Sequence, residues 1–340
     1  MRVVLRKLAS LRLTLVGMVL LALGAALSYD NPAGTPAWVL VVPLAVLALN
    51  LLAAIVSNPR INRRGALLVF HLGLLGIVVL AAVGRLTRLE AHVELTEGAA
   101  FSPEEMIDVR KGPWHDGALD RLYFVQGPYT VDYAPGMVRG ITRNQVLVPD
   151  GQGGLEARVI GDDTPLLMAG YRVYTTFNKG FAPVLTWIPD GGQAVTGTVH
   201  MPSYPLFDFR QANRWTPPGA NEVRFWLQLD TGLDDKVAWT LDPRHARGVL
   251  VVKDGAQRVE LRPGQSVRLE GGSLRYNRLS SWMGYKLYYD PTLHWLFITA
   301  IVAVIGLAAH FWRRFGAIQA YTATQDAARG ASLPGSGEVL

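Results

Sequence analysis

One histidine lies inside a stretch of the chain that is otherwise almost pure hydrocarbon. The stretch LLVFHLGLLGIVVL covers residues 67 to 80, and His71 is its one polar side chain. A neutral imidazole has a hydrogen-bond donor and an acceptor, and apolar surroundings satisfy neither. An ionisable side chain is expensive in such a place and is usually functional. Two tasks suit this imidazole: a hydrogen bond to another polar group, or ligation of a metal through a ring nitrogen.

Asn50 is the polar side chain expected to lie nearest to His71. The two residues are on consecutive apolar stretches joined by residues 57 to 64. At a helical rise of about 1.5 Å per residue, His71 lies about 8 Å and Asn50 about 10 Å from the connecting loop. The two groups could simply hydrogen-bond and hold the helices together, which is worth about 1 kcal/mol. Alternatively, Asn50 fixes the ring tautomer while the other ring nitrogen binds iron.

His310 is a second candidate ligand, in the segment AAHFWRRF. It lies only about 3 Å inside the end of the last apolar stretch. With Trp312, Arg313 and Arg314 beside it, the position is typical of an interfacial anchor. Metal ligation by His310 is the weaker interpretation.

Residues that could perform catalysis are scattered. His92, His115, His200 and His245 have no acidic or serine partner at a recognisable spacing, and no G-x-S-x-G, H-E-x-x-H or P-loop pattern occurs. The chain has no cysteine, which excludes disulfides, thiol redox chemistry and a C-x-x-C-H attachment motif. We therefore expect no catalytic residues, and a subunit that binds rather than catalyses.

Four segments are apolar and long enough to span a bilayer, which takes about 20 residues. They run over residues 13–28, 37–56, 66–84 and 294–312. The first also resembles a signal peptide, but three further spans favour a retained helix. Arginines and lysines precede the first span, fill the loop between the second and third, and follow the fourth. The positive-inside rule then predicts cytoplasmic termini and a large extracytoplasmic region.

The charge balance follows from this orientation. Residues 89–293 carry 21 Lys and Arg against 24 Asp and Glu, a net charge of −3. The rest of the chain carries 12 basic and 3 acidic groups, or +9, and the two parts give the total of +6. The basic pI is thus explained by the positive charges at the predicted cytoplasmic ends of the spans, and nothing in the charge pattern indicates nucleic-acid binding.

The region between the third and fourth spans reads as β structure. Short alternating runs such as HVELTEG and QRVELRPG are separated by glycine, proline and aspartate turns. The predicted fold is therefore four transmembrane helices with an all-β, sandwich or barrel-like domain between helices 3 and 4. The predicted parts are a three-helix region (1–88), the extracytoplasmic domain (89–293), a fourth helix (294–312) and a disordered cytoplasmic tail (313–340). Residues 195–222 are rich in proline and predict a long loop.

The order of these elements resembles that of the ResB-like proteins of System II cytochrome c biogenesis. Three features carry the resemblance: the element order itself, the segment HLGLLGIVVLAAVGRLTRLEAHVELTEGAAF, and the combination of GDDTPLLMAGYRVYTTFNKG with GYKLYYDP before the last span. The likeness extends over most of the chain. Each motif is short, and their ordered combination makes the likeness specific.

The resemblance implies a function at the bacterial inner membrane. ResB-like proteins work with a second integral membrane protein, CcsA (or ResC), to move haem across the membrane and present it to apocytochrome c. A histidine of the third span ligates a transmembrane haem b in that family, and the matching residue here is His71. The partner would supply the tryptophan-rich haem motif and the ligands of the outer haem. A thioredoxin-like thiol reductase is a further expected partner. The alternative function is a scaffolding subunit of a membrane complex that holds no haem.

Overall fold

The computed structural model describes residues 2–32, 34–230 and 236–331, and the chain forms two compact units. The helical unit consists of Met1–Arg88, Lys111–His115 and Asp290–Leu340. The β unit consists of Leu89–Arg110 and Asp116–Tyr289. Residues 111–115, which the sequence assigns to the outer domain, therefore group with the helices.

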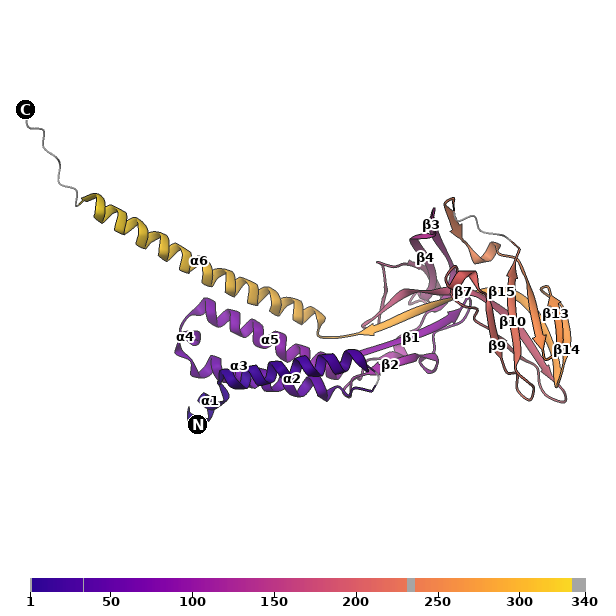
Figure 1. Cartoon of the computed structure of the whole chain (residues 1–340), viewed down its shortest axis with the longest axis horizontal. Helices are drawn as coiled ribbons and strands as arrows, with labels where there is room; N and C mark the ends of the chain where they lie inside the picture. Colours follow the sequence, from indigo (N-terminus) through magenta and orange to yellow (C-terminus); the bar gives the residue numbers. More distant parts are fainter. Residues whose placement is uncertain (1, 33, 231–235, 332–340) are drawn as a thin grey trace, which may run out of the picture. The chain divides into compact units, whose positions relative to one another are not determined.

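The helical unit contains long apolar helices and two short ones (Figure 1). The helices are α1 (Arg2–Leu8), α2 (Leu11–Asp30), α3 (Trp38–Ser57), α4 (Pro59–Asn62), α5 (Gly65–Thr87) and α6 (Leu293–Ala331). Among the described residues, α2, α3, α5 and the part of α6 up to Phe315 are long and apolar enough to cross a membrane. The helix order differs from the prediction, because the short α1 and α4 place five helices before the strands instead of three.

The last helix is longer than its apolar segment. We expected it to end at Trp312 and to be followed by a disordered tail, but α6 continues to Ala331. Residues 313–331 contain alanine and glutamine, which favour helix, and no proline. Polarity alone does not prevent such a segment from being helical. Residues 332–340 of the predicted tail lie outside the described residues.

Glycines bring α5 and α6 into backbone contact. An ideal Cβ at Gly73 would lie 2.6 Å from the backbone nitrogen of Ala303, and one at Gly306 would overlap the backbone nitrogen of Phe70. Gly76 faces the same helix. The backbone at Gly73 and Gly76 is therefore covered by a neighbouring helix. Small residues permit this close approach of membrane helices.

A later segment of the chain supplies hydrogen-bond donors to the last carbonyl groups of α5. The last carbonyls of a helix have no partner within it. Here the backbone N–H groups of Gly112 and Trp114 donate to the carbonyls of Arg88 and Leu86, each at 2.8 Å. This explains why Lys111–His115 groups with the helices.

The strands of the β unit form three sheets. The largest has the order β2 (Ile107–Lys111), β1 (Leu89–Thr96), β15 (Gly272–Tyr289), β7 (Tyr171–Pro189), β6 (Leu166–Met168), with β14 (Ser266–Leu269) on β15 and β8 (Val195–Thr198) on β7. The second has the order β13 (Gln257–Leu261), β12 (Gly248–Asp254), β10 (Val223–Leu229), β9 (Ala212–Trp215). The third has the order β11 (Trp239–Leu241), β3 (Val125–Ala134), β4 (Val138–Pro149), β5 (Leu155–Ile160). A large β-rich domain is thus confirmed, as three sheets around one core.

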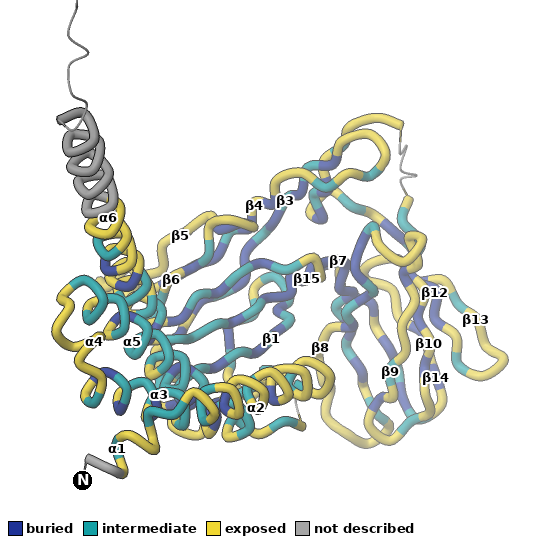
Figure 2. Tube along the Cα trace, turned by 60° about the vertical axis from the view of Figure 1, so that its left-hand side comes forward, coloured by how far each residue is buried: buried dark blue, intermediate teal, exposed yellow. Residues whose placement is uncertain are grey.

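Two long strands form the centre of this unit. β7 has 19 residues and β15 has 18, and they pair antiparallel from Tyr171 opposite Tyr289 to Pro189 opposite Gly272. Both are mainly buried, in contrast to the largely exposed α2 (Figure 2). The segments YRVYTTFNKG and GYKLYYDP, far apart in the sequence, are therefore neighbours in one sheet.

The proline-rich region is more ordered than predicted. Residues 195–222 include strands β8 and β9 as well as the loop between them. Met201 and Tyr204 of that loop are buried in the core, at 1% and 6% exposure. Burial of these apolar side chains explains how a segment with many prolines is held in place.

Candidate functional site

His71 lies on α5, and its ring is held in a tautomer that leaves one nitrogen able to bind a metal. Its Nδ1 is 2.7 Å from the carbonyl oxygen of Leu67, one turn earlier in the helix. A carbonyl oxygen can only accept, so Nδ1 must carry the proton, and Nε2 of the neutral ring has a lone pair. Among the described residues, no group hydrogen-bonds to Nε2. This is the tautomer in which metal-ligating histidines are usually held, with the second nitrogen donating to a carbonyl or carboxylate.

The environment of the His71 ring is apolar. The ring packs edge-to-face on Phe70, with centroids 5.1 Å apart and an interplanar angle of 79°. The same face of the helix carries Leu67, one turn before His71, and Leu74 and Val78 after it, each spaced three or four residues from the next. The side chain is half-buried within this chain. A ligand or a second protein could therefore reach Nε2.

Asn50 does not contact His71, so the predicted pair is wrong. Its Oδ1 accepts from the Thr14 hydroxyl at 2.8 Å, and its Nδ2 donates to the carbonyls of Leu8 at 2.6 Å and Ser10 at 3.1 Å. Asn50 thus fastens the corner between α1 and α2 to α3. The depth of Asn50 along α3 could be predicted from its position in the apolar segment, but the neighbouring helix that it faces could not.

His310 lies on α6 close to the beginning of α5. It lines a pocket of about 680 Å³ together with Arg63, Arg64, Gly65, Ala66, Arg313 and Arg314. His71 is not part of that lining. The two candidate ligands, His71 and His310, therefore do not line this pocket together.

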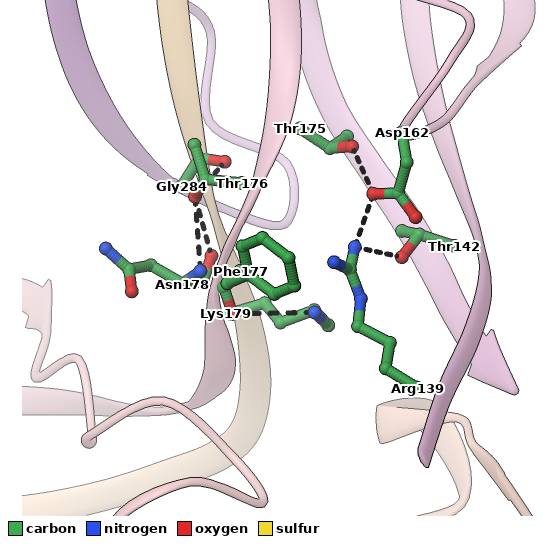
Figure 3. Close-up of polar contacts among 9 residues, drawn as sticks. All are labelled: Arg139, Thr142, Asp162, Thr175, Thr176, Phe177, Asn178, Lys179 and Gly284. Carbon is green, nitrogen blue, oxygen red and sulfur yellow. Dashed lines mark hydrogen bonds and ion pairs between the residues drawn. The ribbon is translucent and has the colours of Figure 1, made fainter. Parts of the chain in front are cut away.

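The β unit contains a charged cluster that the sequence did not reveal (Figure 3). The Arg139 guanidinium donates to the Thr142 hydroxyl at 2.7 Å and to the Asp162 carboxylate, and it lies 4.2 Å over the Phe177 ring. Lys179 is only 1% exposed, and its ammonium donates to the Phe177 carbonyl at 3.4 Å. The pKa of Lys179 is lowered to about 8, chiefly by burial and to a smaller extent by the Arg139 charge, while the Asp162 charge acts in the opposite direction.

A β-bulge creates this cluster. Thr175 pairs with Tyr285 and Lys179 with Met283, so residues 176–178 face Gly284 alone. The extra residues leave Phe177 66% exposed while Lys179 turns inward. Gly284 is required at this point because an ideal Cβ would lie 2.8 Å from the Thr176 hydroxyl oxygen and 2.9 Å from the Asn178 carbonyl oxygen.

We expect Gly284→Ala to destabilise the β unit by about 1–3 kcal/mol, because the added methyl group forces the bulge outward. Denaturant unfolding of the full chain in detergent, followed by tryptophan fluorescence, would measure the loss. Gly197→Ala is the matched control, since a Cβ at Gly197 on β8 meets no atom within 4 Å. Equal stability of the two variants would contradict the packing role of Gly284.

His200 has partners that sequence spacing could not indicate. Its Nδ1 lies 3.1 Å from Glu94, 106 residues away, and its Nε2 lies 2.9 Å from the Thr96 hydroxyl. The ring stacks on Trp282 with centroids 5.0 Å apart. The Thr96 hydroxyl also bonds to Thr198 at 3.0 Å. The Glu94 carboxylate, the His200 ring and the two threonine hydroxyls thus form one hydrogen-bonded network.

The fold and these sites define a multi-pass membrane protein that carries a large β-sheet unit. α5, the part of α6 up to Phe315 and the whole β unit fall within the match to one family model. That model describes the ResB-like family and matches residues 60–315, most of the chain, so the chain belongs to the ResB-like family. His71 and His310 lie within the matched residues, whereas Asn50 precedes them.

The other comparisons add little to the family assignment. No curated protein matches the chain. Among solved structures, the chain is similar to "Cytochrome c Heme Lyase CcmF" at 13% identity and a TM-score of 0.26, over 88% of this chain and 34% of that one. The chain thus spans about a third of that protein's length. A likeness this low says nothing about the fold.

Proposed function

We propose that the chain is the ResB-like subunit of a cytochrome c biogenesis complex that carries haem across the membrane to apocytochrome c. The observation that carries this proposal is His71, whose Nδ1–H is committed to the Leu67 carbonyl and whose Nε2 is available. Membership of the ResB-like family supports the assignment to cytochrome c biogenesis. System II, haem b as the cargo, and a CcsA- or ResC-like partner are parts of the proposal.

The residues around His71 fit a haem cargo. Haem iron takes an imidazole nitrogen as an axial ligand, and the bond from Nδ1 to a carbonyl fixes the tautomer in which Nε2 can serve as that ligand. The leucines on the same helix face offer apolar surface to the macrocycle. Asn50 is engaged elsewhere, so Leu67 takes the role of orienting the ring. The opposite axial ligand would come from the partner protein.

The proposed orientation puts the β unit outside the cytoplasm. Arg63 and Arg64 precede α5, Arg313 and Arg314 follow the apolar part of α6, and all four line one pocket. The positive charges of two spans thus gather at one end, as the positive-inside rule requires of a cytoplasmic side. In this orientation the β unit would receive apocytochrome c. Reduction of its thiols would need a separate thiol reductase, because these 340 residues contain no cysteine.

The proposal is tested on the chain purified together with its CcsA-like partner. We expect His71→Gly to lose most of the bound haem, or to retain it with a shifted Soret band, and exogenous imidazole to restore the original spectrum by filling the vacated space. His310→Ala is the control and should leave the spectrum unchanged. An unaltered haem content and Soret band in His71→Gly would refute ligation by His71. If the unmodified complex contains no haem at all, the scaffold alternative holds.

A further inference from the structure

The arginine-lined pocket at one end of the α5–α6 pair is not used by the function proposed above. Its volume is about 680 Å³, and four of its seven lining residues are arginines. None of the lining residues is acidic. Among the described residues, no carboxylate lies within 4.0 Å of any of these four guanidiniums. Four like charges gathered in one concave site repel one another and attract an anion.

The beginning of α5 adds to this positive field. Arg64 is the N-cap residue of α5 and makes no side-chain capping hydrogen bond, and the first turn contains no acidic residue. The first N–H groups of a helix have no partner within it and carry partial positive charge. Gly65 and Ala66, which begin α5, both line the pocket. An anion there would cap the helix as well as pair with the guanidiniums.

The position of the pocket along the helices indicates which anion it takes. The membrane-spanning segments are Gly65–Thr87 and Leu293–Phe315, so the lining residues lie where both segments end. That level is where phospholipid headgroups meet apolar helix surface. Guanidinium groups bind phosphate oxygens in pairs, and basic pockets between membrane helices are typical headgroup sites. We propose that this pocket binds the phosphate group of an anionic phospholipid.

Lipid binding to the purified full chain in detergent tests the proposal. Native mass spectrometry would compare anionic phosphatidylglycerol with zwitterionic phosphatidylcholine of the same acyl chains, so that only the headgroup differs. We expect at least tenfold tighter binding of phosphatidylglycerol. Inorganic phosphate at millimolar concentration should not displace it. Equal binding of the two lipids would overturn the proposal, and so would displacement by phosphate, which would identify a free-anion site.

Two variants assign the binding to the pocket. Replacing all four arginines by glutamine should remove the preference for phosphatidylglycerol. Replacing them by lysine keeps the charge but loses the paired hydrogen bonds, and should weaken binding about threefold or more. The control is Arg6→Gln with Arg12→Gln, which removes basic residues that do not line the pocket. If the glutamine variant fails to fold, the lysine variant decides, and unchanged binding in it would overturn the proposal. The inference does not depend on His71, since His71→Gly should bind the lipid normally.

Discussion

Gly306→Ala is expected to separate α5 from α6. The added methyl group would overlap the backbone nitrogen of Phe70, which cannot turn away as a side chain could. Gly73→Ala should act in the same way against Ala303, where the Cβ would lie 2.6 Å from backbone nitrogen. Overpacking of this kind costs about 2 kcal/mol per site, and up to about 4 kcal/mol in the double variant. Unfolding by sodium dodecyl sulfate in mixed micelles, followed by circular dichroism, would measure the loss.

A disulfide placed between the helices gives a direct readout of their separation. An ideal Cβ at Gly76 lies 3.1 Å from the Cβ of Thr299, near the spacing that a disulfide needs. The chain has no native cysteine, so Gly76→Cys with Thr299→Cys gives one unambiguous cross-link. We expect mild oxidation to form it, and addition of Gly306→Ala to reduce its yield. The matched control is Gly65→Ala on α5, where a Cβ meets no atom within 4 Å. Full cross-linking in Gly306→Ala would show that the helices tolerate the methyl group.

Lys179→Met is expected to stabilise the β unit at neutral pH by as much as about 3 kcal/mol. The pKa of Lys179 is lowered to about 8 from 10.5, chiefly by burial, and each unit of such a shift corresponds to about 1.4 kcal/mol. Below pH 8 the buried ammonium is charged and this cost is fully present. Methionine has a similar length and no charge to bury. Lys253 of β12 is exposed, so Lys253→Met is the control and should change little.

The pH dependence gives the sign of the effect. Between about pH 8 and 10.5 the unfolded chain holds a proton that the folded Lys179 has lost, so the stability of the unmodified protein should rise with pH. Burial raises the pKa of Tyr171, Tyr204 and Tyr276 to about 12, so these groups lower stability as the pH passes 10. We therefore expect a rise from pH 8 to about 9.5, followed by a fall.

Comparing the unmodified protein with Lys179→Met isolates the contribution of Lys179 to the pH dependence of stability. Denaturant unfolding at pH 7, 8, 9 and 9.5 should show the rise in the unmodified protein and its absence in Lys179→Met. A fall in stability over the same range would mean that Asp162 stabilises the ammonium more than burial penalises it. That result would reverse the predicted sign.

Hydropathy and alternation were sufficient to locate the elements of the fold. A run of apolar residues as long as a bilayer is thick forms a helix wherever it occurs, so the four long helices could be predicted within a few residues. Glycine, proline and aspartate turns in the same way predicted a region of strands. The residues just beyond Trp312 were predicted to be disordered but are helical, because low hydropathy and high helix propensity can occur in the same segment.

The candidate site was predictable only in part. His71 is visible in the sequence because it is a polar residue among apolar ones. The face to which Asn50 points depends on the packing of α3 against α2, which depth along a helix does not determine. Glu94 and His200 meet only because β1 and β8 belong to the same sheet. Lys179 is buried by a bulge, and no spacing rule indicates where a bulge will form.

Two short connections join the helical unit to the β unit. α5 ends at Thr87 and β1 begins at Leu89, while β15 ends at Tyr289 and α6 begins at Leu293. Leu89 and Tyr289 are themselves paired across β1 and β15. Two helices in backbone contact therefore continue into two strands in hydrogen-bonded contact. Leu89 closely follows α5 along the chain, Tyr289 closely precedes α6, and the two residues close one end of a hydrogen-bonded ladder.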